Sequence, residues 1–246
     1  MNIVLTGSSG FLGTEIAKFF HERSNKLIGI DFAEDNNANY LSEFINLDLS
    51  DLSIIESQLQ NRLKNYDSID VVINNAAVKP NGFYEKSASY SVSTWDEVMR
   101  VNVGAAFFVS KSIFNWLRKS ENPSIINISS IYGMVAPDYS IYKDLTRQDY
   151  LFNTPVSYSV SKTALLGLTR HLANEWGKFG IRVNSVSPGG VENHQPDFFV
   201  SNYKKNTPLN RMAVPSDIIS AIEFLISEKS NYITGINLAV DGGWVL

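Results

Sequence analysis

Residues 3–13 read Ile3-Val4-Leu5-Thr6-Gly7-Ser8-Ser9-Gly10-Phe11-Leu12-Gly13, an apolar run followed by three glycines. Glycines at this spacing allow a tight turn from strand to helix, close approach of the backbone to a pyrophosphate, and close packing of helix on strand. The free N–H groups at the start of the helix would face that anion. A purely structural turn is the alternative. We predict that this turn binds a dinucleotide through Gly7, Ser9, Gly10, Phe11, Leu12 and Gly13.

Short apolar runs alternate with longer amphipathic stretches along the rest of the chain. The expected strands are Ile3–Leu5, Leu27–Ile30, Phe44–Leu47, Val71–Ile73, Ile125–Ile128, Arg182–Val186 and Asn237–Val240. The expected helices are Gly10–Glu22, Leu52–Lys64, Thr94–Leu117, Val156–Lys178 and Pro215–Ser227. Runs that are nearly continuous in Val, Ile and Leu are typical of parallel strands covered on both faces. The alternation therefore predicts a single α/β domain over residues 1–246, with a doubly wound, mostly parallel sheet of about seven strands.

Two polar, aromatic segments interrupt this alternation, at Pro137–Pro155 and Glu192–Pro208. Each follows the carboxyl end of an expected strand, where open α/β sheets bind ligands. Loops of this length are usually functional or disordered. We interpret them as an active-site insertion near 137–155 and a substrate lid near 192–208. A surface or subunit-contact loop is the alternative for the insertion.

The second expected strand ends at Asp31, 18 residues after Gly13. A carboxylate at this place can accept both ribose hydroxyls of NAD and would repel the 2′-phosphate of NADP. No arginine or lysine directly follows Asp31 to favour that phosphate. The position predicts NAD(H) in preference to NADP(H), with a solvated loop aspartate as the alternative.

Tyr158 and Lys162 lie four residues apart on an expected helix, which places both side chains on one face. A tyrosine with a pKa near 10 is a poor base at neutral pH, and a cation beside it stabilises the phenolate. The same spacing occurs at Tyr139 and Lys143, in a stretch without helical periodicity. We therefore predict Tyr158 and Lys162 as the acid–base pair.

Composition excludes several classes of protein. The 246 residues carry a formal charge of −4, which argues against a nucleic-acid binder. The absence of cysteine excludes disulfide scaffolds and thiolate metal sites, and the three histidines lack metal-ligand spacing. No apolar run reaches the roughly 20 residues that span a bilayer, and Met1 is not followed by a signal-peptide pattern. We expect a cytoplasmic protein with a small polar substrate, and no metal, nucleic-acid or membrane partner.

Taken together, these motifs resemble the single-domain branch of the short-chain dehydrogenase/reductase family, over essentially the whole chain. The resemblance is carried by Thr6-Gly-x-x-Gly-x-x-Gly13, Asn74-Asn75-Ala76-Ala77, Asn102, Ile128-Ser129-Ser130, Tyr158-x-x-x-Lys162 and Pro188-Gly189. It implies a Rossmann-type fold, a nicotinamide cofactor, interconversion of a secondary alcohol and a ketone, and a homodimer or homotetramer.

The resemblance also implies roles for individual residues. Tyr158 would exchange a proton with the substrate oxygen, and Ser130 would hydrogen-bond that oxygen. Lys162 would lower the pKa of Tyr158 and hold the nicotinamide ribose, while Asn102 would position a water in the proton relay. Further cofactor contacts are expected from Asp48, Leu49, Asn75, Ala76, Ala77, Pro188, Gly189 and Val191.

The chain departs from the family pattern at three places. The smallest departure is in Asn74-Asn75-Ala76-Ala77, where Ala77 replaces the usual final glycine. Phe11 stands where glycine or alanine is usual, as in the nucleotide-sugar branch, so an epimerase or dehydratase with retained NAD is one alternative. A non-catalytic NAD-binding protein is another. Ser130 and Tyr158 are separated by 28 residues, about twice the usual number, which indicates the insertion.

Residues 129–142 and Asp241–Trp244 are similar to bacterial flagellin-modification and surface-sugar oxidoreductases. This similarity implies that the substrate is a sugar or a sugar derivative. The expected substrate contacts are Ser130, Tyr132, Tyr142 and His194.

Overall fold

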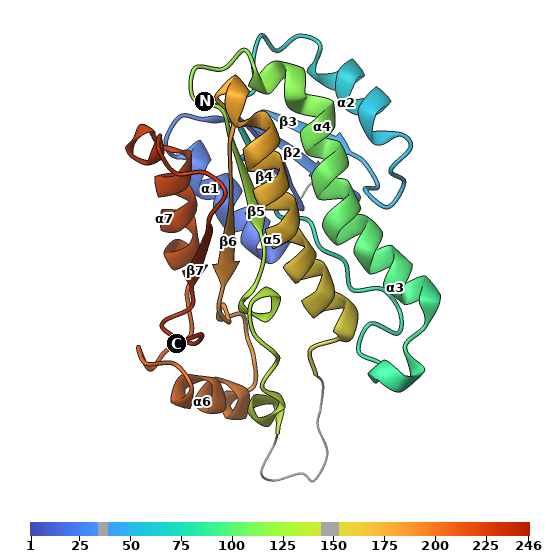
Figure 1. Cartoon of the computed structure of the whole chain (residues 1–246), viewed down its shortest axis with the longest axis vertical. Helices are drawn as coiled ribbons and strands as arrows, with labels where there is room; N and C mark the ends of the chain where they lie inside the picture. The colour runs from blue at the N-terminus through green and yellow to red at the C-terminus, as the bar shows by residue number, and fades with distance from the viewer. Residues whose placement is uncertain (34–38, 144–152) are drawn as a thin grey trace.

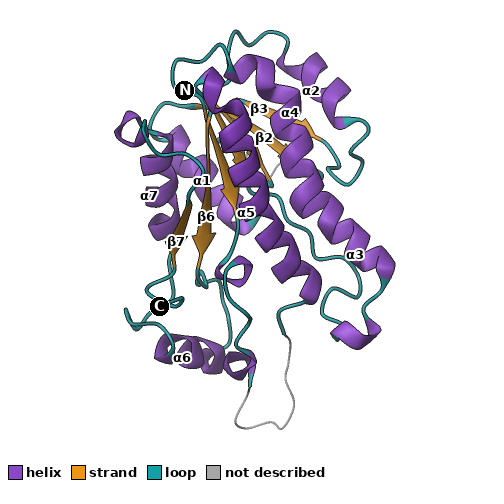
Figure 2. Cartoon of the chain, in the orientation of Figure 1, coloured by secondary structure: helices purple, strands orange, loops and turns teal. Residues whose placement is uncertain are grey.

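The computed structural model of the chain describes residues 1–33, 39–143 and 153–246. Within them, seven parallel strands form one sheet in the order β3-β2-β1-β4-β5-β6-β7 (Figures 1 and 2). The strands are β1 (Asn2–Thr6), β2 (Lys26–Asp31), β3 (Glu43–Asn46), β4 (Val71–Asn74), β5 (Ser124–Ile128), β6 (Arg182–Pro188) and β7 (Asn237–Val240). All seven predicted strands are confirmed to within two residues at each end. The strand order reverses between β1 and β4, which is where such sheets bind ligands.

Helices cover both faces of the sheet (Figure 1). They are α1 (Phe11–His21), α2 (Ile55–Leu63), α3 (Val92–Met99), α4 (Ala106–Leu117), α5 (Val156–Trp176), α6 (Asp197–Lys205) and α7 (Pro215–Ile226). One apolar core contains residues of α2, α4 and α5, and a second contains residues of α1 and α7. Along β1, Val4 packs into the first core, whereas Ile3 and Leu5 pack into the second. Burial on both faces explains the continuous apolar runs.

No helix in the described part of the chain is long and apolar enough to span a membrane.

The predicted helix Thr94–Leu117 is wrong as a single element. It is divided into α3 and α4 by a π-helical turn, Arg100–Ala105, that contains Asn102. The Asn102 side chain is fixed by two residues that are distant in the sequence, Val78 and Ser161. Turns of this kind occur frequently at functional sites, and hydrophobic periodicity does not reveal them.

The segment expected as an irregular lid near 192–208 contains the helix α6. Phe199 and Tyr203 lie one turn apart and are both buried, so α6 presents an aromatic face to its surroundings. Its partners are Tyr142, in the described part of the 137–155 insertion, and Trp244 near the C-terminus. Residues 144–152 of the insertion lie outside the described residues. The described residues before this gap thus pack against α6 beyond the carboxyl ends of the strands (Figure 1).

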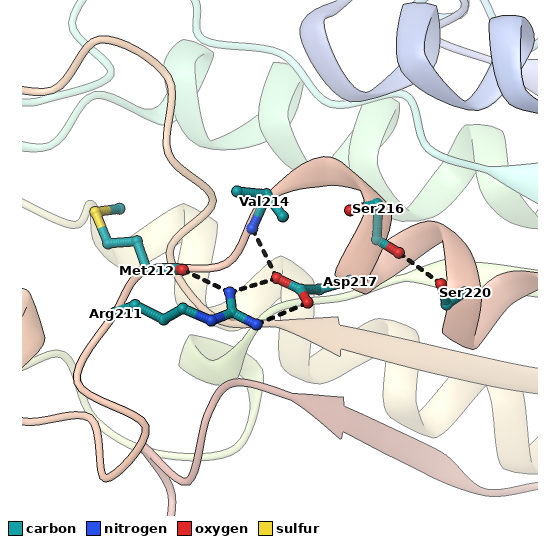
Figure 3. Close-up of polar contacts among 6 residues, drawn as sticks. All are labelled: Arg211, Met212, Val214, Ser216, Asp217 and Ser220. Carbon is teal, nitrogen blue, oxygen red and sulfur yellow. Dashed lines mark hydrogen bonds and ion pairs between the residues drawn. The ribbon is translucent and has the colours of Figure 1, made fainter.

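The α6 segment is closed at its base by contacts that join its two ends. Val191 pairs with Ala213 in an isolated parallel bridge. Arg211 then forms a bidentate ion pair with Asp217 on α7, with N···O distances of 2.6 and 2.9 Å (Figure 3). The Asp217 carboxylate also accepts the Val214 N–H at 2.8 Å and so caps the start of α7. The Val191–Ala213 bridge and the Arg211–Asp217 ion pair therefore fix the two ends of the α6 segment relative to each other and to α7.

Candidate active site

A cavity of about 940 Å³ lies at the carboxyl ends of the strands, within the range of small-molecule sites. Its wall is formed by residues that follow β1 to β5, by the end of β6, and by α5 and α6. Sixteen predicted cofactor contacts line it: Gly7, Ser9, Gly10, Phe11, Leu12, Asp31, Asp48, Leu49, Asn75, Ala76, Ala77, Tyr158, Lys162, Pro188, Gly189 and Val191. The structure thus brings together residues from widely separated parts of the chain.

The glycine turn has the geometry that a cofactor cradle requires. Gly7 has a φ of 67°, and a Cβ there would lie 2.9 Å from the Ala76 Cα. Gly13 is the one predicted cofactor contact of this turn that does not line the cavity. A Cβ at Gly13 would lie only 2.0 Å from the Gly7 carbonyl oxygen, so Gly13 allows α1 to pack on β1.

Asp31 is 9% exposed and is held by two backbone N–H groups. One carboxylate oxygen accepts the Ser9 N–H at 2.9 Å, and the other accepts the Ala33 N–H at 3.1 Å. These bonds fix the carboxylate in the cavity wall while each oxygen keeps a lone pair for a ligand. The cations that the structure describes in this wall are Lys79 and Lys162. The glycine cradle and the oriented carboxylate together fit a dinucleotide cofactor.

Tyr158 and Lys162 lie in the first two turns of α5 and both line the cavity. The Lys162 Nζ donates a hydrogen bond to the Ile128 carbonyl oxygen at 2.7 Å and lies 5.7 Å from the centroid of the Tyr158 ring. The Tyr158 hydroxyl interacts with the Ser130 hydroxyl, and Phe83 packs edge-on against the Tyr158 ring at 6.4 Å. Tyr139 of the alternative pair is 47% exposed and does not line the cavity.

Asn102 lies behind the cavity wall rather than in it. It is 2% exposed, and its amide oxygen accepts the Val78 N–H at 3.1 Å. Its amide nitrogen donates to the Ser161 hydroxyl at 3.0 Å. Asn102 therefore connects the irregular segment that follows β4 to α5, close to Tyr158.

Of the expected substrate contacts, Ser130, Tyr132 and Tyr142 line the cavity, but His194 does not. His194 is exposed in a turn with a φ of 56°, and its neighbours Asn193 and Gln195 line the wall instead. Sequence analysis missed several wall residues outside the motifs: Lys79, Phe83, Tyr84, Asn153, Thr154, Phe199 and Tyr203. The first three follow the Asn74–Ala77 motif closely in the sequence, and this position was the signal that could have identified them as site residues.

Comparison with known families agrees with this geometry. Residues 1–143 match the family model described as short chain dehydrogenase, and residues 145–245 match that described as Enoyl-(Acyl carrier protein) reductase. The chain belongs to the short-chain dehydrogenase family. It is therefore an oxidoreductase of secondary alcohols and ketones, as the motifs predicted.

Short-chain dehydrogenases similar to this chain have different substrates. The 3-oxoacyl-(acyl-carrier-protein) reductase FabG of Chlamydia trachomatis is 31% identical over 98% of this chain and 95% of the relative. The 2-dehydro-3-deoxy-D-gluconate 5-dehydrogenase of Dickeya dadantii is 27% identical over 98% and 94%, respectively. A solved short chain dehydrogenase of Leptospira borgpetersenii with bound NAD⁺ is 32% identical, with coverages of 100% and 92% and a TM-score of 0.85.

Burial is the leading cause of the pKa shifts of the predicted acid–base pair, Tyr158 and Lys162. Burial raises the pKa of Tyr158, and the hydrogen bond with Ser130 opposes that rise. Burial lowers the pKa of Lys162 from 10.5 to about 8. The expected lowering of the Tyr158 pKa by Lys162 is therefore not the leading effect, since the Lys162 ammonium is directed to the Ile128 carbonyl. In the described residues, no group of histidine, aspartate and glutamate side chains could hold a metal ion.

Proposed function

We propose that this short-chain dehydrogenase uses NAD(H) to interconvert a secondary alcohol and a ketone in a small polar substrate. The observation that carries the proposal is the meeting of the Tyr158 and Ser130 hydroxyls in the cavity that also holds the glycine turn and Asp31. When bound, the nicotinamide would supply or accept the hydride. The chain's own residues supply the proton and orient the reacting oxygen.

In this proposal Tyr158 donates its phenolic proton to the ketone oxygen during reduction and removes the alcohol proton during oxidation. Ser130 hydrogen-bonds the same oxygen and keeps it beside the phenol. Lys162 holds the cofactor ribose from the floor of the cavity, where its Nζ lies beside the Ile128 carbonyl. Asn102 keeps the Val78 backbone and α5 in register and positions the water of the proton relay.

The raised pKa of Tyr158 gives the two directions different pH dependences. Oxidation needs the phenolate, so its kcat/KM should rise with pH on the alkaline side, whereas reduction needs the phenol and should not. Ser130→Ala removes the hydrogen bond that lowers the Tyr158 pKa, so the rising limb of oxidation should move to higher pH. The measurement is kcat/KM in both directions across the pH range, for wild type and variant. If the rising limb of kcat/KM for oxidation moved to lower pH in Ser130→Ala, the proposed effect of Ser130 on the Tyr158 pKa would be wrong.

The preference for NAD(H) rests on the fixed Asp31 carboxylate and is supported by the NAD⁺-bound Leptospira relative. The first experiment is a fluorescence titration with NADH and, separately, NADPH, with the four tryptophans as energy donors. We expect tighter binding of NADH. Equal binding of both would remove the basis for the preference, and binding of neither would refute the cofactor site and favour a different, non-catalytic role.

Asp31→Ala should lower the preference for NADH over NADPH by about 10-fold or more, because it removes a charged hydrogen-bond acceptor for the ribose and the repulsion of a phosphate. Asp31→Asn is the matched variant, since it keeps the shape of the side chain and removes its charge. The ratio of the two dissociation constants is the measurement. If both variants keep the wild-type ratio, Asp31 does not contact the ribose.

For the substrate we propose a sugar derivative, within surface-glycan or flagellin modification. Residues 129–142 support the surface-glycan part through sequence similarity alone, and the sugar-acid dehydrogenase of Dickeya dadantii supports a sugar in general. A screen of sugars and polyols for net NADH formation from NAD⁺ tests this. A retained cofactor with no net NADH would instead support the nucleotide-sugar epimerase or dehydratase alternative.

A further inference from the structure

Tyr203 on α6 makes a contact with the proposed cofactor turn that no sequence motif indicates. Its side chain is 2% exposed and lines the cavity. Its phenolic oxygen accepts the Gly190 N–H at a distance of 2.5 Å. Gly190 directly follows Pro188, the last residue of β6, and Gly189, and both of these are expected cofactor contacts. A residue of the lid segment thus bonds to the backbone of the cofactor turn.

The two glycines of this turn leave room for the Tyr203 ring and for nothing larger than hydrogen. A Cβ at Gly189 would lie 2.7 Å from the Tyr203 hydroxyl oxygen and 2.9 Å from the Asp241 Cα. A Cβ at Gly190 would lie 2.8 Å from Tyr203 Cε2. Side chains at these positions would force α6 away from the turn. The close approach of α6 to the turn therefore requires Gly189, Gly190 and Tyr203 together.

The Tyr203 ring contacts two other aromatic rings. Trp244 stacks on it, with centroids 4.4 Å apart and an interplanar angle of 21°. Phe199 lies on α6 at 6.1 Å, and Tyr142 of the insertion lies 5.4 Å beyond Phe199. These residues belong to an apolar cluster that is separate from the two main cores. The hydroxyl therefore cannot leave Gly190 without displacement of the insertion, α6 or the C-terminal turn.

We propose that Tyr203 is a positioning residue that couples α6 to the Pro188–Gly190 turn, so that the affinity for NADH depends on the placement of α6. The inference rests on the proposed cofactor site. Burial raises the pKa of Tyr203 to about 12, so the hydroxyl stays neutral and its geometry does not change with pH in the working range. By linkage, a turn that is ordered by NADH must also stabilise α6.

Tyr203→Phe keeps the ring and removes the hydrogen bond to Gly190, which leaves the part-buried Gly190 N–H without this partner. We expect the NADH dissociation constant to be about 10-fold higher, measured by energy transfer well below the unfolding temperature. Tyr142→Phe is the matched control: it belongs to the same aromatic row, but its hydroxyl bonds to Thr154 at 2.7 Å rather than to the turn. Its NADH affinity should equal that of wild type.

A second measurement tests the coupling itself. Trypsin can cut α6 at Lys204 and Lys205, and NADH should slow this cleavage in wild type and in Tyr142→Phe but not in Tyr203→Phe. Equal NADH affinity and equal protection in wild type and Tyr203→Phe would overturn the inference and leave the proposed function intact. A loss of thermal stability in Tyr203→Phe at unchanged NADH affinity would also overturn the inference, because the bond between Tyr203 and Gly190 would then only stabilise the fold. If wild type binds no NADH, the proposed function fails, and the inference fails with it.

Discussion

Tyr158→Phe should lower kcat by roughly 1,000-fold while NADH binding stays within about twofold of wild type. The substitution removes the phenolic oxygen that interacts with the Ser130 hydroxyl and leaves the ring in contact with Phe83. The Asp31 carboxylate accepts its two described hydrogen bonds from the backbone N–H groups of Ser9 and Ala33, which the substitution leaves in place. Loss of turnover with retained binding therefore separates a proton-transfer role from a structural one. Turnover and NADH titration on the same preparation are the two measurements.

Tyr139→Phe is the matched control because Tyr139 has the same spacing to a lysine, Lys143, as Tyr158 has to Lys162. Tyr139 is half exposed in a short 3₁₀ helix and lies outside the cavity wall, so its variant should keep full activity. If instead Tyr139→Phe is inactive and Tyr158→Phe is active, the acid–base pair has been assigned to the wrong tyrosine.

The fold was predictable because its signals are local. Successive residues of a strand enter opposite cores, as Ile3 and Val4 do. A strand that is buried on both faces is therefore recognisable as a continuous apolar run in the sequence. The Tyr158–Lys162 spacing and the position of Asp31 at the end of β2 are also local, and the structure brings these residues into one cavity.

What the sequence could not predict depends on contacts between distant segments. The helix α6 is stabilised by Tyr142 and Trp244, which lie about sixty residues before it and forty after it. The π-helical turn at Asn102 depends on Val78 and Ser161. The pKa of Tyr158 is raised by burial in the assembled cavity. The presence of a lysine four residues away was therefore not enough to predict the direction of this pKa shift.

Lys162→Met should abolish a pH dependence of stability that this buried lysine imposes. The pKa of Lys162 is about 8 in the folded chain, against 10.5 when it is exposed. Between these values the unfolded chain holds a proton that the folded chain has lost, so the free energy of unfolding rises with pH across this window. The full rise amounts to roughly 3 kcal/mol, and it is absent from the variant. Urea unfolding of both proteins near pH 7.5 and pH 10 measures it.

The difference between wild type and variant isolates this effect, because every other titrating group is common to both proteins. The hydrogen bond from Lys162 to the Ile128 carbonyl is also lost in the variant, but that cost does not vary with pH and leaves the slope unchanged. Lys119→Met, which makes the same substitution at an exposed lysine, is the control. A stability difference that stays constant from pH 7.5 to pH 10 would contradict the lowered pKa of Lys162. A confirmed slope would mean that, at neutral pH, the chain keeps a buried ammonium that costs stability, as expected for a group retained for the cofactor-binding role proposed for it.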